Sequence, residues 1–265
     1  MLTLLSPAKS LDLTSRLPTR KHSDARLLDE SARLIDVMLT KSPEEIGALM
    51  SISDDLASLN AQRYQDFELP FTRRNARPAL LLFAGDVYQG MDAGRRFGER
   101  DFTEANKTIR ILSGLYGVVR PLDLIQPYRL EMGTRLATER GASLYDWWGT
   151  TITDLLRVDL AASPGDAVVV NLASVEYFSA VQPDGLGARV ISPRFEDEDE
   201  RGAWRVMSFS AKRARGEMAA WLVLNRVRHA STLRHFDGAG YGYVKNLSTP
   251  DVPVFRRPRS ARGGV

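Results

Sequence analysis

The sequence predicts an α/β protein of mixed α+β type, built as a single compact domain around a partly parallel central sheet with a cationic cleft. Two observations favour this class. Short apolar runs with strand character alternate along the chain with longer amphipathic segments, which is typical of strands connected by helices. Hydrophobic residues make up 43% of the 265 residues and charged residues 26%, a balance typical of globular proteins. Residues 1–257 are assigned to the domain and residues 258–265 to a flexible basic tail.

The chain is expected to begin with a buried strand that is followed by helices. Residues 1–6, MLTLLS, form an apolar run that ends at Pro7, because proline cannot donate a hydrogen bond to a sheet ladder. Residues 25–41 place apolar side chains at helical spacing, so one face of that helix should contact the core. SPEE at residues 42–45 supplies a serine N-cap, a proline in the first turn and a capping-box glutamate. Residues 51–67 are predicted to form two short helices joined by a turn.

The middle of the chain is expected to alternate between helix and strand. Residues 101–119 run from a helix into a strand, and residues 143–161 are predicted to form one amphipathic helix despite Gly149. Residues 166–174, DAVVVNLAS, contain a continuous apolar run bounded by polar residues. Such a run is typical of a strand that is buried on both faces of a sheet.

The last third of the chain is expected to contain a hairpin, a long helix and several short strands. Residues 188–195 and 203–211 are predicted to pair as a hairpin, with the acidic run EDEDE at residues 196–200 as its solvated tip. Residues 212–227 form the last long amphipathic segment and predict a helix. Glycine, tyrosine and valine alternate after it, which indicates short strands.

Composition excludes several classes of function. The chain has no cysteine, so disulfides, thiolate metal ligands, cysteine-held clusters and a peroxide-reducing thiol are absent. No run of about 18 apolar residues could span a membrane, and the N-terminus lacks the basic residue and apolar core of a signal peptide. A cytoplasmic protein without a membrane partner is therefore expected. The three histidines match no zinc-binding spacing, and the chain has no Walker A sequence or dinucleotide fingerprint, so neither a metal nor a cofactor is predicted.

Positive charge is concentrated in the last quarter of the chain. From Arg201 onward, thirteen Lys or Arg residues face three Asp or Glu residues, whereas the first 200 residues carry a net charge of −7. A basic region of this kind could face nucleic acid or another polyanion. Alternatively, its side chains only solvate a helix face and the C-terminal end of the chain.

Polar residues at three strand-to-loop junctions predict a cleft. The junctions are residues 6–12, SPAKSLD, residues 171–177, NLASVEY, and the stretch 113–133, SGLYGVVRPLDLIQPYRLEMG. In open α/β sheets, ligands bind beyond the carboxyl ends of the strands, so these loops are expected to converge. Lys9 lies in the first of them. Within the third, Gly114 and Gly117 indicate a close backbone approach or a bulge.

Cations are expected to line this cleft. Lys212, Arg213 and Arg215 are predicted to lie in the first turn of a helix, where the helix dipole disfavours cations and a bound anion would offset that cost. Alternatively, the helix begins later than predicted. Arg120 precedes a proline and must be extended, whereas Arg129 shares one face of a strand with Glu131. Arg129 and Glu131 either pair with each other or line the cleft.

Carboxylates offer a different chemistry. Asp123, Glu131 and Glu176 are candidate catalytic residues, because a carboxylate can act as general acid or base. With Asp86 they could also bind Mg²⁺, although no spacing ties these four residues together.

Six longer strings resemble the YaaA family of bacterial peroxide-stress proteins. The resemblance runs in the same order from Met1 to about Arg257, and it is specific because several uncommon strings agree. The strings are LLSPAKSLD at residues 4–12, FAGDVYQG at 83–90, LSGLYGVVRPLDLIQPYRLEMG at 112–133, LYDWWG at 144–149, VVNLASVEYF at 169–178 and FSAKRARGEMA at 209–219. Residues 1–257 are thereby identified as a YaaA-like domain.

The resemblance implies a cytoplasmic protein that protects cells during hydrogen peroxide stress and is associated with limiting free intracellular iron. It also implies an unusual α/β fold with a positively charged cleft and a helix-hairpin-helix-like element, which together suggest binding of duplex or branched DNA. Residues 51–67 are the candidate for that element. The cations that fall within the family-like strings are Lys9, Arg120, Arg129, Lys212, Arg213 and Arg215.

Three hypotheses follow from the sequence. The leading one is a DNA-binding protein of the peroxide-stress response whose cleft cations contact phosphates. The second is an enzyme that acts on a small anionic or phosphorylated substrate in the same cleft, with Asp123, Glu131 or Glu176 as acid or base. The third is a scaffold in which these polar strings only stabilise the fold.

Overall fold

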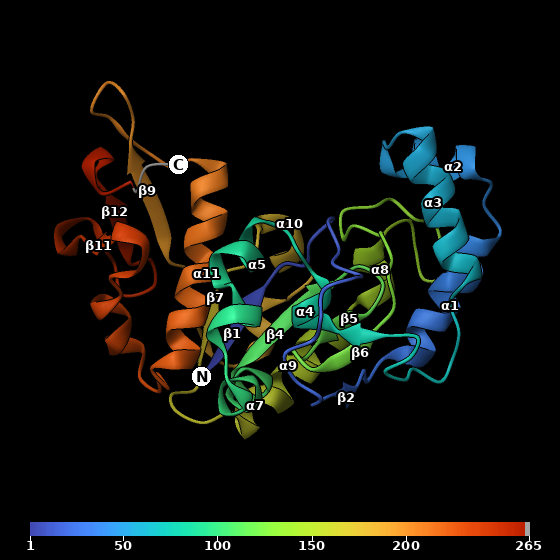
Figure 1. The fold of residues 1–265 in the computed structure, drawn as a ribbon, viewed down its shortest axis with the longest axis horizontal. Helices are drawn as coiled ribbons and strands as arrows, with labels where there is room; N and C mark the ends of the chain where they lie inside the picture. The colour runs from blue at the N-terminus through green and yellow to red at the C-terminus, as the bar shows by residue number, and fades with distance from the viewer. Residues whose placement is uncertain (263–265) are drawn as a thin grey trace.

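The structure, a computed structural model, describes residues 1–262 and is built around a five-stranded sheet (Figure 1). The strand order is β5-β4-β1-β7-β8, and β4, β1, β7 and β8 run parallel to their neighbours while β5 pairs with β4 in the antiparallel sense. The order places the N-terminal strand β1 at the centre. The strands are β1 (Leu2–Leu5), β4 (Ile109–Ser113), β5 (Gly117–Val119), β7 (Val168–Asn171) and β8 (Arg189–Ile191).

Two smaller sheets flank the central one. The three-stranded sheet has the order β2-β6-β3 and the four-stranded sheet the order β10-β9-β12-β11. The first lies beside helices α1–α3 and the second beside α11, at opposite ends of the molecule (Figure 1). Their strands are β2 (Ser23–Asp24), β3 (Arg77–Pro78), β6 (Asp123–Ile125), β9 (Arg194–Glu198), β10 (Trp204–Arg205), β11 (Gly242–Tyr243) and β12 (Val254–Arg257).

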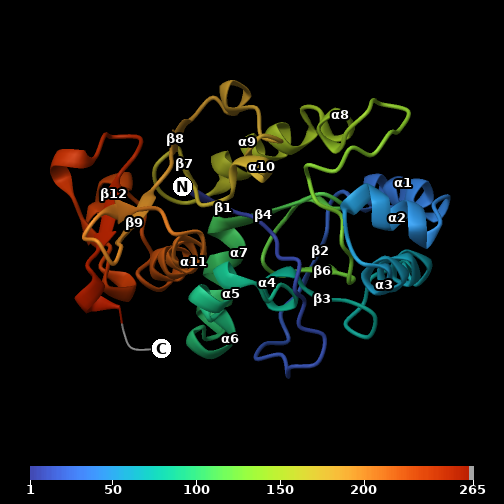
Figure 2. The same ribbon diagram turned by 90° about the horizontal axis from the view of Figure 1, so that it is seen from above.

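Helices cover both faces of the central sheet. Figure 2 shows α9 and α10 on one face and α5, α7 and α11 on the other. The α-helices within the described residues are α1 (Leu28–Leu39), α2 (Pro43–Met50), α3 (Asp54–Gln65), α4 (Ala79–Leu82), α5 (Asp86–Met91), α6 (Ala93–Arg96), α7 (Glu99–Thr108), α8 (Leu144–Trp148), α9 (Thr151–Ala162), α10 (Val175–Phe178) and α11 (Ser208–Leu224). None of them is both long enough and apolar enough to cross a membrane.

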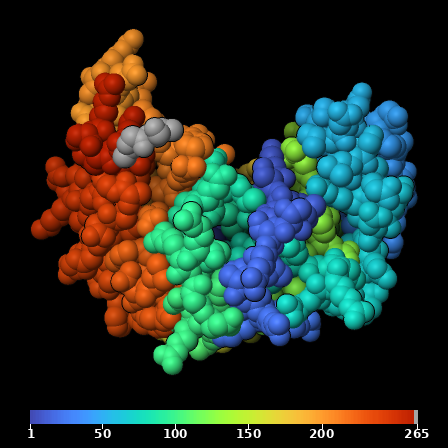
Figure 3. All heavy atoms as spheres, in the orientation of Figure 1, coloured from blue at the N-terminus to red at the C-terminus, as the bar shows by residue number. Residues whose placement is uncertain are grey.

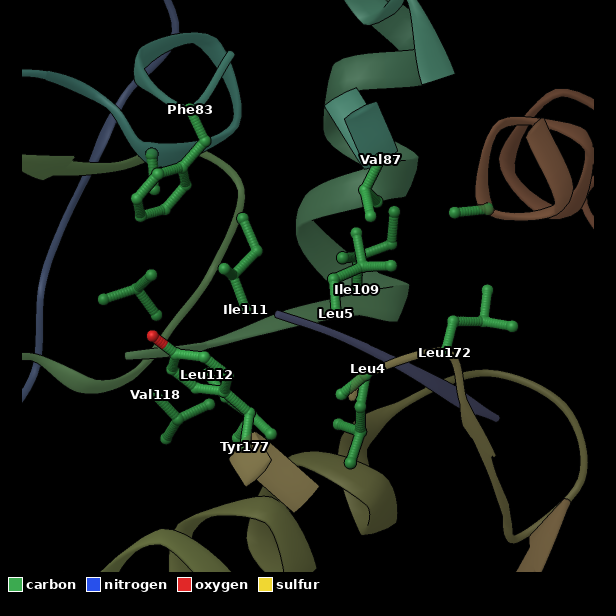
Figure 4. Close-up of a cluster of buried hydrophobic side chains, with 14 of the residues drawn as sticks. Leu4, Leu5, Phe83, Val87, Ile109, Ile111, Leu112, Val118, Leu172 and Tyr177 are labelled. Carbon is green, nitrogen blue, oxygen red and sulfur yellow. The ribbon is translucent and has the colours of Figure 1, made fainter. Parts of the chain in front are cut away.

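The hydrophobic core lies on the two faces of the central sheet. Leu4 and Leu5 of β1 are fully buried. Figure 4 shows Val87 of α5 over one face of the strands and Tyr177 of α10 on the other. Burial on both sides explains why these strands read as continuous apolar runs rather than as alternating ones. The predicted mixed α/β class with a partly parallel sheet is confirmed.

Several predicted elements have the expected form. The strand at the N-terminus, the helix in residues 25–41 and the helix-to-strand transition in residues 101–119 are all present. The capping box of α2 is also present, since the backbone N–H of Glu45 donates to Ser42 Oγ and the backbone N–H of Ser42 donates to Glu45 Oε2.

Two predicted helical segments are wrong. Residues 51–67 form a turn and one helix, α3, instead of two short helices. The helix that precedes this turn is α2, which ends at Ser51 with φ 52°. Residues 143–161 form two helices, because Gly149 adopts φ 47° and ψ −121°, a conformation that ends α8 before α9 begins.

The predicted hairpin of residues 188–211 is only partly correct. β8 joins the central sheet beside β7, and only β9 and β10 form the antiparallel pair. Pro193 separates β8 from β9, since it cannot continue a ladder as a donor.

The acidic run at residues 196–200 is not a solvated tip throughout. Glu196 and Asp197 are 4% and 0% exposed and belong to β9, which runs parallel to β12. The register sets Arg256 opposite Glu196 and Arg257 opposite Asp197, and each arginine Nε donates to its carboxylate at 2.8 and 2.7 Å. A buried carboxylate is tolerated here because a cation and hydrogen bonds satisfy it.

The basic excess of the last quarter is partly balanced by earlier carboxylates. Ion pairs across the fold join six of its arginines to residues of the first 200. The pairs are Arg205 with Asp199, Arg226 with Asp101, Arg228 with Glu104, Arg256 with Glu196, and Arg257 and Arg262 with Asp197. Local sequence charge therefore overstates the charge that this part of the fold presents to solvent.

The segment assigned to a flexible basic tail is described only as far as Arg262. The backbone N–H of Arg259 donates to Glu198 at 3.0 Å, and Arg262 contacts the Glu198 carbonyl oxygen. Residues 263–265 lie outside the described residues.

Candidate functional site

A pocket lies beyond the carboxyl ends of β1 and β7, at the base of the hollow between helices α1–α3 and α11 (Figure 3). Its cavity volume is about 420 Å³. The predicted junctions converge here, since residues 6–10, 128–131 and 172–177 all contribute to its lining. Parallel strands end at one edge of the sheet, so their loops meet where ligands bind in open α/β folds.

Hydrogen bonds between the loops fix the base of the pocket. The backbone N–H of Ser174, at the N-cap of α10, donates to Ser6 Oγ at 2.8 Å, which ties the loop after β7 to the loop after β1. The Tyr88 hydroxyl of α5 donates to the Ser6 carbonyl oxygen at 2.9 Å. Three elements far apart in the sequence are thereby held together.

The stretch that follows β6 forms a second wall. A Cβ at Gly114 would lie 2.2 Å from the Leu130 carbonyl oxygen, so only glycine allows this close approach of the two backbones. The Tyr64 hydroxyl of α3 donates to the Arg129 carbonyl oxygen, and Tyr128 shares a hydrogen bond of 2.6 Å with Ser113 Oγ. The predicted close approach at Gly114 is confirmed.

Buried tyrosines line the pocket beside its charged groups. Tyr88, Tyr128 and Tyr177 are each less than a tenth exposed. Burial raises the pKa of all three phenols well above the ordinary value, so these hydroxyls stay protonated at neutral pH.

Glu131 lies at the centre of a charged cluster. Lys9 Nζ and Arg129 Nη2 each lie 2.9 Å from Glu131 Oε1. The second carboxylate in the pocket, Glu176, accepts a hydrogen bond of 2.9 Å from the backbone N–H of Gly133. Lys9 is 63% exposed, whereas Arg129 is 15% exposed, so the cluster extends from the rim into the wall.

Arg215 of α11 is the unusual cation of the pocket. It is partly buried, and within residues 1–262 no ion pair or hydrogen bond involves its side chain. Burial lowers the pKa of Arg215, and no nearby carboxylate raises it. Lys212, three residues earlier, lies on the same face of α11 and also lines the pocket. Because neither side chain has a counter-ion among the described residues, their charge is available to a bound anion.

Comparison with known proteins decides the family. A family model described as peroxide stress protein YaaA matches residues 1–247. The chain belongs to the YaaA family. Its relatives include UPF0246 proteins of three bacteria. The one from Alcanivorax borkumensis is 50% identical over 258 residues, and the match covers 97% of this chain and 99% of that protein. The proteins from Tolumonas auensis and Idiomarina loihiensis are 51% and 49% identical, over 97% of this chain and 98% of each relative.

Two of the cations predicted from YaaA-like strings lie outside the pocket lining. Arg120 Nε donates to Asp123 Oδ1 at 2.9 Å, and its Nη2 donates to the Asp24 carbonyl oxygen at 2.9 Å. Arg213 lies over the Phe209 ring, 4.8 Å from its centroid, and donates to Gln89 Oε1 at 2.9 Å. The pocket therefore brings together Lys9, Arg129, Lys212 and Arg215, but not these two.

The candidate acid Asp123 has a structural environment in this YaaA-family chain. It is 0% exposed in β6, and it accepts hydrogen bonds from Ser23 Oγ at 2.7 Å and from the Arg120 backbone N–H at 2.8 Å. Burial raises the pKa of Asp123, although these hydrogen bonds and Arg120 oppose the shift. Its contacts join β6 to β2, away from the pocket that holds Glu131 and Glu176.

The expected position of the cations on α11 is wrong. The helix begins at Ser208, with Met207 as N-cap, so Lys212 and Arg215 lie beyond its first turn. The argument from the helix dipole therefore does not apply, because that effect falls off within the first turn. What distinguishes Arg215 is its burial without a partner, which requires the tertiary structure.

Of the three lining tyrosines, Tyr177 lies in a junction predicted to form the cleft, whereas Tyr88 and Tyr128 were not predicted as lining residues. Tyr88 lies in the family-like string FAGDVYQG, which was the available signal, but a tyrosine at helical spacing is equally typical of a core position. Within residues 1–262, no group of three or more histidine, aspartate or glutamate side chains is arranged to hold a metal ion.

Proposed function

We propose that this YaaA-family chain is a peroxide-stress protein that binds DNA with its hollowed face, where the pocket cations contact phosphate. The observation that carries the proposal is Arg215, a partly buried cation beside Lys212 in the pocket; neither has a counter-ion among the described residues. A phosphate group would satisfy both cations.

The shape of the molecule supports the proposal. The hollow in Figure 3 is open on one side and lies between the α2–α3 helices, in blue and cyan, and α11, in orange. A short turn at residues 51–53 joins α2 to α3. We propose this helix pair as the helix-hairpin-helix-like element, since such a pair could contact the phosphate backbone on the far side of the hollow.

DNA binding should weaken steeply as salt rises. The logarithm of the affinity for duplex and branched DNA is expected to fall by about 0.9 per logarithmic unit of salt for each neutralised phosphate. Arg215→Ala should reduce this slope by about 1 and weaken binding equally for different sequences. Fluorescence anisotropy of labelled DNA from low to high salt measures both quantities.

The matched control is Arg157→Ala, which removes the same charge from α9, where Arg157 pairs with Asp154 in solvent. Its affinity and slope should equal those of the unmodified protein. Absence of binding at low salt, or a slope that Arg215→Ala leaves unchanged, would contradict the proposed phosphate contact.

We also propose that the protein limits free intracellular iron under peroxide stress, a proposal that rests on family membership. Cells that lack the gene should contain more iron detectable by electron paramagnetic resonance after peroxide exposure, and the unmodified gene should reverse the increase. Full reversal by the Arg215→Ala gene as well would separate the effect on iron from DNA binding. An unchanged iron signal in the deletion strain would contradict the effect.

A second candidate function is catalysis on a small anionic or phosphorylated substrate. The size of the pocket favours it, since the volume of about 420 Å³ is within the range of about 300–1,000 Å³ that is typical of small-molecule sites. Glu131 and Glu176 would supply the acid or base. Lys9→Ala separates the two functions, because an enzyme should lose turnover sharply whereas DNA affinity should fall only by the share of one contact.

A further inference from the structure

The pocket carries charge of both signs. Four cations line it, Lys9, Arg129, Lys212 and Arg215, together with three carboxylates, Asp86, Glu131 and Glu176. A phosphate group matches the cations, whereas the carboxylates would repel phosphate and suit hydrogen-bond donors instead. A complementary ligand therefore has an anionic end and, at its other end, groups that donate hydrogen bonds.

The two kinds of charge are not mixed evenly. Lys9 and Arg129 already pair with Glu131, whereas Lys212 and Arg215 on α11 have no ion pair within residues 1–262. The uncompensated positive charge therefore belongs to α11. Hydrogen-bond acceptors lie on the loops that follow β6 and β7. Glu131 Oε1 accepts both hydrogen bonds from Arg129, and within residues 1–262 no hydrogen bond involves its Oε2.

The walls between these ends suit a flat, partly apolar group. Buried Tyr88, Tyr128 and Tyr177 line the pocket together with Leu130 and Leu172. A duplex is far too wide for a cavity of about 420 Å³, whereas a single small ligand is not. An aromatic base with a sugar and a phosphate combines a flat face, donor groups and an anionic end.

Exposed apolar side chains stand beside the pocket. Val175 is 85% exposed at the first position of α10, between the lining residues Ser174 and Glu176. Phe209 of α11 is 56% exposed, three residues before Lys212. Apolar side chains of this kind insert between base steps where a protein unstacks a nucleotide from DNA.

We infer that the pocket binds one nucleotide, with its phosphate at Lys212 and Arg215 and its amino or hydroxyl donors at Glu131 and Glu176. The same chemistry is present in a free mononucleotide and in a nucleotide that has left the stack of bound DNA. Val175 and Phe209 favour the second source, and in that form the inference rests on the proposed DNA binding.

Two experiments distinguish the sources. Isothermal titration with each of the four deoxynucleoside monophosphates, and with inorganic phosphate, tests the free ligand. A duplex that carries 2-aminopurine opposite a mismatch tests the second source, because the fluorescence of this base increases when it leaves the stack. The anisotropy of the same duplex, followed in parallel, reports DNA binding independently of unstacking.

The unmodified protein is expected to increase the 2-aminopurine fluorescence and to bind at least one mononucleotide more tightly than inorganic phosphate. Arg215→Met should weaken mononucleotide binding by about tenfold or more, the share of a hydrogen-bonded charge contact. Glu176→Gln should change the preference among the four bases while phosphate binding stays the same. Arg157→Met on α9, where Arg157 pairs with Asp154 in solvent, is the control and should bind mononucleotides as the unmodified protein does.

The outcomes separate this inference from the proposed function. Duplex binding without a fluorescence increase and without mononucleotide binding overturns the nucleotide pocket and leaves the DNA proposal intact. Mononucleotide binding that depends on Arg215, without duplex binding, overturns the DNA proposal and supports the free nucleotide as ligand. Absence of all three signals from a correctly folded protein, as judged by circular dichroism, overturns both.

Discussion

Replacement of Gly216 by alanine is expected to lower the free energy of unfolding by about 3 kcal/mol or more, the upper end of what overpacking costs. A Cβ at Gly216 of α11 would lie 1.8 Å from the Val87 carbonyl oxygen of α5, and one at Gly90 of α5 would lie 2.2 Å from the Arg213 carbonyl oxygen. The two helices therefore touch backbone to backbone. A side chain must separate them, and neither contact atom can rotate away.

Chemical denaturation measures the effect, and Gly94→Ala in α6 is the matched control. A Cβ at Gly94 has no atom within 4 Å, so this variant should be as stable as the unmodified protein or more stable by up to about 1 kcal/mol, because alanine favours a helix. The separation of α5 from α11 should also disturb the pocket, to which the helices contribute Tyr88 and Arg215. Equal stability of the two variants would show that the helices can move apart without cost.

Replacement of Asp159 by alanine is expected to destabilise the protein by roughly 3–5 kcal/mol, the cost of removing one partner from a buried ion pair. The Asp159 carboxylate of α9 accepts hydrogen bonds from Arg26 Nη1 at 2.7 Å and from Arg26 Nη2 at 2.8 Å. Arg110 Nε of β4 donates a third hydrogen bond to Asp159 Oδ2. Arg110 and Asp159 are only 6% and 9% exposed. Without the carboxylate, the buried guanidinium of Arg110 loses its ion-pair partner.

The matched control is Asp154→Ala on the same helix. Asp154 pairs with Arg157, and both side chains are more than half exposed, so the loss should be less than about 1 kcal/mol. Urea denaturation of both variants gives the comparison. If the two variants lost the same small amount, the buried pair would contribute no more than a surface pair.

The Asp159 effect should also depend on pH. Burial alone would raise the pKa of Asp159, but hydrogen bonds from Arg26 and Arg110 and their charges outweigh burial and hold the pKa below the ordinary 3.8. A depressed pKa means that the contribution is complete above the unfolded-state value and is lost as pH falls through the folded-state value. The stability difference between Asp159→Ala and the unmodified protein should therefore be constant near neutrality and shrink below about pH 3.8.

The pocket contains groups that the sequence pointed to and groups that it did not. Lys9, Glu131 and Glu176 follow strands or adjoin glycines, so the rule that ligands bind beyond strand ends was enough to group their loops. Arg120 satisfied the same sequence criteria, yet it pairs with Asp123 beside β2. Arg120 and Arg129 each precede a carboxylate by two or three residues in the sequence. Only the path of the chain between the sheets places Arg129 in the pocket and Arg120 outside it.

Some strands and helices are determined by residues that are close together in the sequence. The strand β1 ends where Pro7 removes a donor, α2 begins at its serine cap, and the apolar run of β7 requires burial on both faces. These features need only neighbouring residues, so the sequence by itself determined them, together with the mixed α/β class and the YaaA family.

The tertiary structure decided which charges are compensated. Asp197 lies in a run of five acidic residues that reads as a solvated tip, but β12 sets Arg257 beside it from sixty residues away. Arg215 lies in a basic string like its neighbours, yet burial against α5 and the strand ends leaves it without a partner among the described residues. Ion pairing depends on distances between segments remote in sequence, and no local pattern encodes those distances.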